Sequence, residues 1–265
     1  MKVTAIPVRE DNYSYLLVDD ATKVAAAVDP YDVEKVTAAA DKLGVHLVAS
    51  LTTHHHFDHS GGNKVAILIS TVFASTYPDA VIYAGSDQAP AATKFVKDGD
   101  EFTLGKNIRI KCLATPCHTQ DSICYHVTDA SDASHPGGVF TGDTLFIGGC
   151  GRFFEGTGAE MHAALSYLGT LPDDTIAYIG HEYTSDNAKF GLHVDPDNKD
   201  LARLTEIAKK NKITAGLTTI SDEKGWNVFM RLKDAAVRRA TKADAETPDS
   251  AVIEALREQK NKFRG

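Results

Sequence analysis

A segment of seven residues, 53–59, places four histidines and one aspartate directly after an apolar run at 45–51. His54 and His56 are two positions apart, so in an extended segment their rings point to one side and the ring of His55 points away. Imidazole and carboxylate groups are ligands for zinc, iron(II) and manganese. The alternatives are a surface cluster or the remnant of a purification tag, but a tag would stand at a terminus. The segment therefore predicts a metal site.

The second half of the segment predicts ligands for a second metal ion. Asp58 and His59 are adjacent, so they face the same side only where the chain turns. Ser-Gly-Gly at 60–62 makes such a turn easy, because these residues are small and glycine is conformationally permissive. We therefore expect one short segment to offer two ligands to each of two metal ions.

A catalytic site for two metals needs about three protein ligands per ion, with one ligand shared. Three further strand-like runs lead to His118, Asp143 and His181, and glycine directly precedes the last two. In α/β folds the ends of strands and the loops beyond them commonly carry the chemistry. A lone histidine is more often structural, so the prediction of a metal centre depends on the whole set.

The remaining sequence predicts a mixed α/β domain followed by a helical extension, with a catalytic domain at 1–184 and a helical substrate-binding domain at 185–265. Strands are expected at 3–8, 13–18, 23–28, 45–52, 81–84, 101–104, 108–114, 123–128, 138–141 and 175–179. Helices are expected at 33–43, 159–168, 198–212, 228–240 and 250–263. Short polar links between the first three strands predict an antiparallel meander.

Composition narrows the class of protein. The chain has 265 residues, of which 43% are hydrophobic and 24% charged, as in an ordinary globular enzyme. It has no run of roughly 18 apolar residues and no signal peptide, so we expect a cytoplasmic protein without a membrane span. The four cysteines have no C-x-x-C spacing and are expected to be reduced and buried.

The charge pattern indicates what kind of molecule the protein can bind. A net charge of −8 argues against nucleic acid. Residues 231–265 nevertheless hold nine Lys or Arg against six Asp or Glu. This basic tail is either a solvated helix face or a source of cations for an anionic small molecule.

The set of ligand candidates resembles the motif set of the metallo-β-lactamase superfamily. Within it, the chain closely resembles glyoxalase II, the hydroxyacylglutathione hydrolases, over nearly its whole length. The matching stretches are residues 11–16, 51–63, 111–119, 140–146, 180–183 and 229–231. The resemblance implies an αββα sandwich of two facing mixed sheets flanked by helices, followed by a C-terminal helical domain.

The resemblance also assigns the metal ligands. It implies that one metal is held by His54, His56 and His118, that the other is held by Asp58, His59 and His181, and that Asp143 bridges them. We expect two divalent ions with a bridging hydroxide, zinc first and iron or manganese as alternatives. Asp58 is expected to orient the nucleophile or to shuttle its proton.

In that family basic residues and tyrosines grip the glutathione part of the substrate. The matching positions here are Arg152, Tyr183, Arg257 and Lys260, whereas Phe154 stands where the family has a tyrosine. One hydrogen bond to the ligand backbone is therefore expected to be missing. Arg257 and Lys260 are three residues apart and lie on one helix face, where with Arg152 they can hold a carboxylate.

The activity implied is hydrolysis of S-D-lactoylglutathione and other S-2-hydroxyacylglutathiones to glutathione and the hydroxy acid, the second step of methylglyoxal detoxification. A thioester suits the site because a thiolate, with a reference pKa of about 8.5, leaves without a strong general acid. The alternatives are another superfamily enzyme, such as a lactonase or a mononuclear-iron persulfide dioxygenase, and a non-catalytic metal-binding protein. Metal stoichiometry would distinguish another superfamily enzyme from a hydroxyacylglutathione hydrolase. A non-catalytic protein would have a closed, four-coordinate metal site. We expect a monomer.

Overall fold

The computed structural model describes residues 1–64 and 72–265 and divides into two compact units. The first unit comprises Met1–Ala114 and Asp121–Gly142, and the second comprises Thr115–Gln120 and Asp143–Gly265. This division does not test the domain boundary predicted after residue 184, which stays a prediction.

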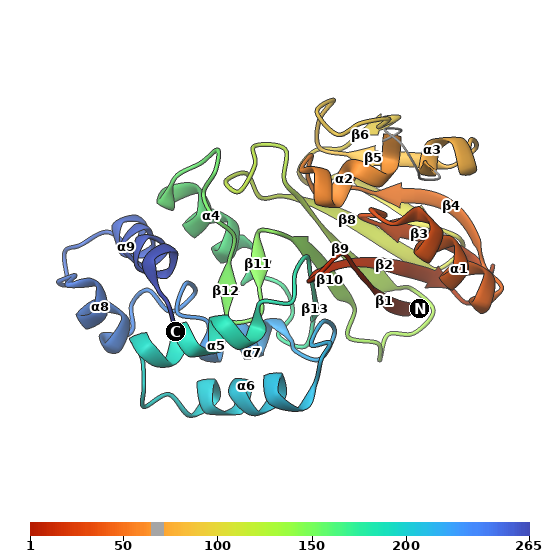
Figure 1. The fold of residues 1–265 in the computed structure, drawn as a ribbon. Helices are drawn as coiled ribbons and strands as arrows, with labels where there is room; N and C mark the ends of the chain where they lie inside the picture. The colour runs from red at the N-terminus through yellow and green to blue at the C-terminus, as the bar shows by residue number, and fades with distance from the viewer. Residues whose placement is uncertain (65–71) are drawn as a thin grey trace. The chain divides into compact units, whose positions relative to one another are not determined.

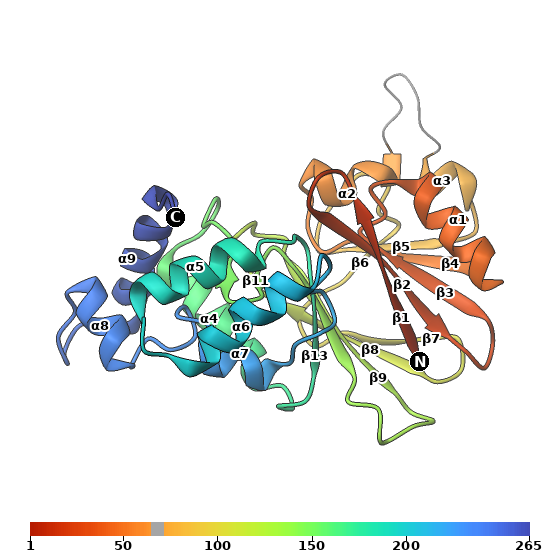
Figure 2. The same cartoon turned by 60° about the horizontal axis from the view of Figure 1, so that its bottom comes forward.

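The first unit contains a sheet with the strand order β1-β2-β3-β4-β5-β6. Its strands are β1 (Lys2–Val8), β2 (Asn12–Asp19), β3 (Val24–Val28), β4 (His46–Leu51), β5 (Val81–Ala84) and β6 (Lys94–Phe95). The first three strands pair antiparallel, which confirms the predicted meander, and β3 to β6 pair in parallel. Figure 2 shows helices α1 (Val33–Leu43), α2 (Phe57–Lys64) and α3 (Phe73–Thr76) on one face of this sheet.

Helix α1 shows how the sequence determines these elements. Asp32 caps its first turn by accepting a hydrogen bond from the Lys35 amide at 3.1 Å. The helix ends at Gly44, which adopts φ +64°, so the predicted stop is confirmed. Its buried side chains, Val33 and Val36 among them, pack in one apolar cluster with alternate residues of β1 to β4.

The second sheet of the first unit has the order β10-β9-β8-β7, and its strands pair antiparallel. The strands are β7 (Glu101–Leu104), β8 (Ile108–Ala114), β9 (Ile123–Asp129) and β10 (Gly138–Gly142). Rings join the two sheets: Tyr15 of β2 meets Phe140 of β10 edge-on at 5.2 Å, and Tyr83 stacks on Phe102 at 4.1 Å. The side chains between the sheets thus form one core.

The second unit is mainly helical (Figure 1, green to blue). Its elements are the hairpin β11 (Leu145–Phe146) and β12 (Gly149–Cys150), strand β13 (Ile176–Ile179), and helices α4 (Gly158–Leu168), α5 (Thr184–Val194), α6 (Lys199–Lys210), α7 (Ile220–Trp226), α8 (Ala235–Thr241) and α9 (Asp249–Lys262). The expected C-terminal helices are therefore present, and helix α5 begins directly after His181, Glu182 and Tyr183.

Two expectations were wrong. Residues 60–62 do not form a turn but lie inside α2, where Gly62 is needed because a Cβ there would come within 1.8 Å of the Pro30 carbonyl oxygen. The helix expected at 228–240 begins only at Ala235, after the cap residue Asp234. The buried residues before it form turns instead, and the Asn227 side chain accepts a hydrogen bond from the Phe229 amide at 3.1 Å.

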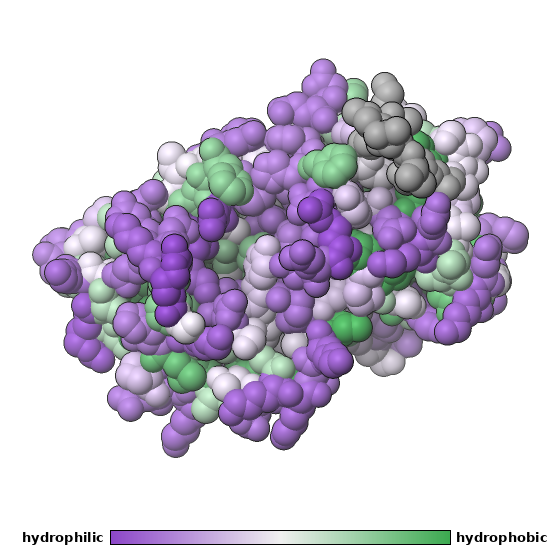
Figure 3. Space-filling model, viewed as in Figure 1, coloured by the Kyte–Doolittle hydropathy of each residue, from purple (hydrophilic) through white to green (hydrophobic). Residues whose placement is uncertain are grey.

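The surface is ordinary for a folded protein. The face drawn in Figure 3 is mostly hydrophilic, and its apolar residues are scattered. Among the described residues, no helix is both long enough and apolar enough to span a membrane. All four cysteines are buried and unbridged, as expected.

Candidate metal-binding and substrate-binding sites

The first unit gathers histidines in the segment that follows β4. His54 Nε2 lies 3.1 Å from His56 Nδ1, so the two rings point to a common place. The ring of His55 turns elsewhere, and its Nδ1 lies 2.8 Å from Asp121 Oδ1. The alternation of directions that the sequence predicts is therefore present in the structure.

Asp58 and His59 reach their positions through a helix. Both lie in the first turn of α2, and His59 Nε2 is 3.8 Å from Asp58 Oδ2. The amide nitrogen of Asn12, at the start of β2, donates a hydrogen bond of 2.9 Å to Asp58 Oδ2. The orientation of the Asp58 carboxylate is thus held by a residue from another element.

Asp29 organises this part of the site and was not predicted. It is buried at the end of β3, and its carboxylate accepts hydrogen bonds of 2.7 Å from both the amide and the hydroxyl of Thr53. The same carboxylate lies 2.9 Å from His59 Nδ1. The available signal was an aspartate directly after a buried strand, which is the signal used for Asp143.

These contacts fix the tautomers of two histidines. The single hydroxyl proton of Thr53 goes to Asp29, so in the 3.1 Å contact between Thr53 Oγ1 and His54 Nδ1 the imidazole is the donor. His59 likewise donates from Nδ1 to Asp29. In both rings Nε2 is then the unprotonated nitrogen, which is the form that ligates a metal ion. The donor set of the first unit therefore fits a divalent cation.

The second unit brings together the three ligand candidates that come from distant parts of the sequence. Asp143 Oδ2 lies 3.4 Å from Nε2 of His118 and 3.4 Å from Nε2 of His181. His118 donates from Nδ1 to the Arg152 carbonyl at 2.9 Å, which leaves Nε2 unprotonated. Gly151 allows this close packing, since a Cβ there would lie 1.9 Å from the Asp143 carbonyl oxygen. One carboxylate between two imidazoles is an arrangement suited to cation binding.

Aromatic rings surround these ligands in the second unit. The ring of Tyr183 stacks on His181 at 4.8 Å with an interplanar angle of 8°. The ring of Phe146, from the β11–β12 hairpin, meets Tyr183 edge-on at 5.2 Å. Phe154 lies 5.2 Å from His118 and is 60% exposed, which is unusual for so large an apolar side chain.

The three predicted cations of the substrate site also lie in the second unit. Arg257 is buried, lies over the Phe229 ring and donates to the Cys150 carbonyl at 3.0 Å. Lys260 donates to the Asp186 carbonyl, in the first turn of α5, at 2.8 Å. Burial and the neighbouring charge of Arg257 lower the pKa of Lys260 to about 8. Burial, and to a lesser extent the charge of Arg152, lowers the pKa of Arg257. A cluster that disfavours its own positive charge is suited to an anionic ligand.

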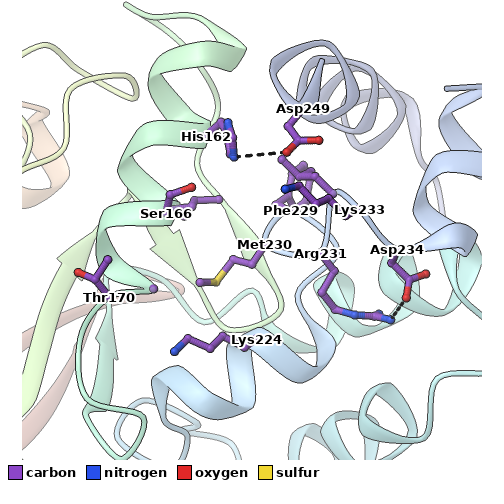
Figure 4. Close-up of a pocket in the computed structure, with 13 residues that line it drawn as sticks. His162, Ser166, Thr170, Lys224, Phe229, Met230, Arg231, Lys233, Asp234 and Asp249 are labelled. Atoms are coloured by element: carbon purple, nitrogen blue, oxygen red, sulfur yellow. Dashed lines mark hydrogen bonds and ion pairs between the residues drawn. The ribbon is translucent and has the colours of Figure 1, made fainter. Parts of the chain in front are cut away.

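A cavity of about 650 Å³ in the second unit lies among α4, α7, the segment after Asn227 and the start of α9 (Figure 4). None of the predicted site residues lines it. Several of its charged groups are paired: Arg231 with Asp234 at 2.7 Å, His162 with Asp249 at 4.0 Å and Lys224 with Asp173 at 2.6 Å. We therefore do not assign the chemistry to this cavity.

Comparisons with known proteins agree on one family. A family model described as "Hydroxyacylglutathione hydrolase C-terminus" matches residues 182–263. The chain is 41% identical to the Arabidopsis thaliana protein named "Hydroxyacylglutathione hydrolase cytoplasmic", over 100% of both chains. It is 40% identical to the Saccharomyces cerevisiae "Hydroxyacylglutathione hydrolase, mitochondrial", over 94% of this chain and 90% of that one.

A comparison of structures identifies the fold. A metallo-beta-lactamase from Staphylococcus aureus aligns with a TM-score of 0.59 and 24% identity, over 78% of this chain and 72% of that chain. The chain therefore has the metallo-β-lactamase fold, with C-terminal helices in addition, as the sequence predicted.

Proposed function

The chain belongs to the hydroxyacylglutathione hydrolase family, and from this premise we propose that it hydrolyses S-D-lactoylglutathione to glutathione and D-lactate. Related S-2-hydroxyacylglutathiones are substrates of the same reaction. The observation that carries the proposal is the composition of the second unit, which holds metal-ligand candidates around Asp143 together with the cation cluster of Arg257 and Lys260. A lactone would need no such cluster, so a glutathione thioester is the better substrate.

Two divalent ions are the proposed cofactors, zinc first and iron or manganese as alternatives. His54, His56 and His118 would hold one ion, Asp58, His59 and His181 the other, and Asp143 would bridge them. The tautomers of His54, His59 and His118 support this assignment, because each ring has its proton on Nδ1 and its lone pair on Nε2. When bound, such ions would activate a water at neutral pH and polarise the thioester carbonyl.

The side chains of the protein supply the remaining steps. Asp58, oriented by Asn12, accepts the proton of the attacking water. The tetrahedral centre then collapses and the carbon–sulfur bond breaks. The glutathione thiolate departs without a general acid, because the reference pKa of a thiol is about 8.5.

The substrate is held by residues of the second unit. Arg152, Arg257 and Lys260 bind the carboxylates of glutathione, and the Tyr183 hydroxyl binds its backbone. At the position of Phe154 an exposed ring replaces the tyrosine hydroxyl that the family uses, so binding there is apolar only. We infer that this chain tolerates changes in the thiol near Phe154 more readily than its relatives with tyrosine do.

Location and assembly belong to the same proposal. The Arabidopsis relative is named cytoplasmic and the yeast relative mitochondrial. We propose that this protein works in the cytoplasm as a monomer, with a small-molecule substrate and without a nucleic-acid or membrane partner. Size-exclusion chromatography with light scattering tests the monomer.

The test of the proposed function is the rate of S-D-lactoylglutathione hydrolysis by purified protein, before and after chelation and after metal is added back. We expect rapid hydrolysis that the chelator abolishes and that added zinc, iron or manganese restores. Fully metallated protein that leaves the thioester intact would overturn the proposal.

A further inference from the structure

Helix α7 and the residue after it carry a buried polar group that the proposed reaction does not use. Glu223 and Asn227 are both fully buried. The Glu223 carboxylate accepts hydrogen bonds of 2.9 Å from the Gly148 amide, the Trp226 indole and the Asn227 side chain. A carboxylate is costly to bury, so its burial with three donors needs an explanation.

The partners of this group lie in the β11–β12 hairpin. Gly148, at its turn, adopts φ +69° and gives its amide proton to Glu223. Asn227 donates to the Gly149 carbonyl at 3.0 Å, and a third side chain, Asn187 of α5, donates to the Ile147 carbonyl at 3.1 Å. Side chains from outside the hairpin thus satisfy the main chain of its turn.

Both strands of the hairpin contact residues of the proposed substrate site. Phe146 of β11 packs edge-on against Tyr183 at 5.2 Å and against His181 at 5.9 Å. In β12 the Cys150 carbonyl accepts the hydrogen bond of Arg257 at 3.0 Å. A shift of so short a hairpin would therefore move the supports of Tyr183 and Arg257 together.

We propose that Glu223 and Asn227 are positioning residues for glutathione binding, which act by holding the β11–β12 hairpin against Tyr183 and Arg257. The inference rests on the proposed function for the identity of the ligand. Neither residue needs to touch the substrate, because each acts through the hairpin. Burial raises the pKa of Glu223 to about 7, and Asp222 on the same helix adds like-charge repulsion, although the three donors oppose this shift. Below about pH 7 Glu223 is protonated, and its carboxyl group then has fewer lone pairs for the three donors. The hairpin is therefore held less firmly in that pH range.

The matched variants are Glu223→Gln and Asp222→Asn, two neighbours on α7. Glu223→Gln keeps the shape but turns an amide NH₂ toward groups that are themselves donors. Asp222→Asn weakens the capping box with Thr219 and the ion pair with Arg203 and removes the like charge beside Glu223, but it leaves the three hydrogen bonds of Glu223 in place. Asn227→Ala removes the hydrogen bond to the Gly149 carbonyl and keeps those that Glu223 accepts from Gly148 and Trp226. It is the variant to measure if Glu223→Gln does not fold, and the same rise in KM and Kd is expected of it.

The experiment measures kcat and KM for S-D-lactoylglutathione, bound metal, and the Kd of glutathione by calorimetry in each metallated variant. We expect Glu223→Gln to raise KM and Kd about tenfold while kcat and metal content stay within twofold of the parent. Asp222→Asn should lower the melting temperature and leave KM and Kd within twofold. Unchanged KM and Kd in Glu223→Gln, or equal effects in the two variants, would overturn the inference.

Hydrogen exchange separates this inference from the proposed function. If the parent neither hydrolyses the thioester nor binds glutathione, the proposed function fails. The positioning role is then decided by amide exchange in residues 145–150, which should be faster in Glu223→Gln and at the parental rate in Asp222→Asn. Exchange in the hairpin that does not respond to Glu223→Gln would reject the role whatever the ligand is. The emission of Trp226, the single tryptophan, gives a second signal, because its indole donates to Glu223.

Discussion

In the first unit, four ligand candidates come from one segment of six residues, 54–59, whereas the three of the second unit come from separate segments around Asp143. Two residues from other elements support the first set: the Asp29 carboxylate holds His59 directly and His54 through Thr53, and Asn12 holds Asp58. The second set lies beside the aromatic and cationic residues proposed for the substrate. On the proposed assignment, the first unit supplies metal ligands and the proton acceptor Asp58, while the second supplies metal ligands together with the residues that bind the substrate.

The largest effect should come from the ligand that the second unit surrounds with two histidines. Asp143→Ala removes the carboxylate 3.4 Å from both His118 and His181. We expect loss of bound metal and a fall in kcat/KM of about a thousandfold, or about 4 kcal/mol. Metal analysis and steady-state kinetics check this. Two bound metals at full rate in Asp143→Ala would show that the site is wrongly assigned.

A smaller effect is expected in the first unit, where the support and not a ligand is removed. Asp29→Ala leaves the Thr53 amide and the His59 Nδ1 proton without their acceptor. We expect metal affinity to fall about a hundredfold, the upper end of what such supporting groups contribute. Competition with a chromophoric chelator measures this affinity. If KM rose while metal affinity stayed at the parental value, the role of Asp29 as a support for the metal ligands would be contradicted.

Removal of Arg257 and Lys260 should weaken substrate binding and leave the metal content unchanged. In the double variant Arg257→Ala with Lys260→Ala, we expect KM for S-D-lactoylglutathione to rise about thirtyfold, since charge-assisted hydrogen bonds contribute about 1.5–3 kcal/mol. Metal content should remain that of the parent. Arg239→Ala with Lys242→Ala, two cations of the same basic tail, is the control and should leave KM within twofold. A large loss of metal in the Arg257→Ala, Lys260→Ala variant would contradict the assignment of these cations to substrate binding.

Restoring the hydroxyl that the sequence lacks should sharpen substrate recognition in the second unit. Phe154→Tyr keeps the ring beside His118 and adds one donor. We expect KM for the glutathione thioester to fall about fivefold, the worth of one hydrogen bond of about 1 kcal/mol. Phe153→Tyr is the control at the neighbouring position. An unchanged KM in Phe154→Tyr would mean that the ring at this position does not face the ligand.

The smallest effect concerns pH. Lys260, whose pKa is lowered to about 8, is charged below that pH and loses its charge above it. An anionic substrate should therefore bind best below about pH 8, and KM should rise about threefold between pH 7 and 9. Lys260→Arg keeps the charge over this range and should flatten the profile. If KM rose equally in Lys260→Arg, another group would be responsible.

Much of the fold could be predicted because periodic strands and well-capped helices such as α1 are specified locally. The metal-ligand candidates were visible for a similar reason, since histidine and aspartate after a strand are distinctive. Helix α2 was missed because Gly61 and Gly62 suggested a turn, whereas Gly62 serves a close approach to Pro30. Helix α7 and the β11–β12 hairpin are short, and the contacts that stabilise them join Glu223 to Gly148 across a long stretch of sequence.

The roles of supporting residues could not be predicted for the same physical reason. Asp29 and Asn12 act through hydrogen bonds to residues that are distant in the sequence, Thr53 and Asp58 among them. A single aspartate or asparagine carries no periodic signal that would reveal such a partner. Arg257 and Lys260 lie together on α9, as their spacing of three residues predicted, whereas their role toward the substrate stays a prediction.

The proposal with the widest consequence is that the ligand candidates at 54–59, His118, Asp143 and His181 hold two metal ions for thioester hydrolysis. Its most direct test is to titrate metal-free protein with zinc while metal content and S-D-lactoylglutathione hydrolysis are measured on the same samples. We expect activity to rise until two ions per chain are bound, and we expect Asp143→Ala to reach neither the stoichiometry nor the rate. Full activity at one ion per chain, or no activity at two, would contradict it.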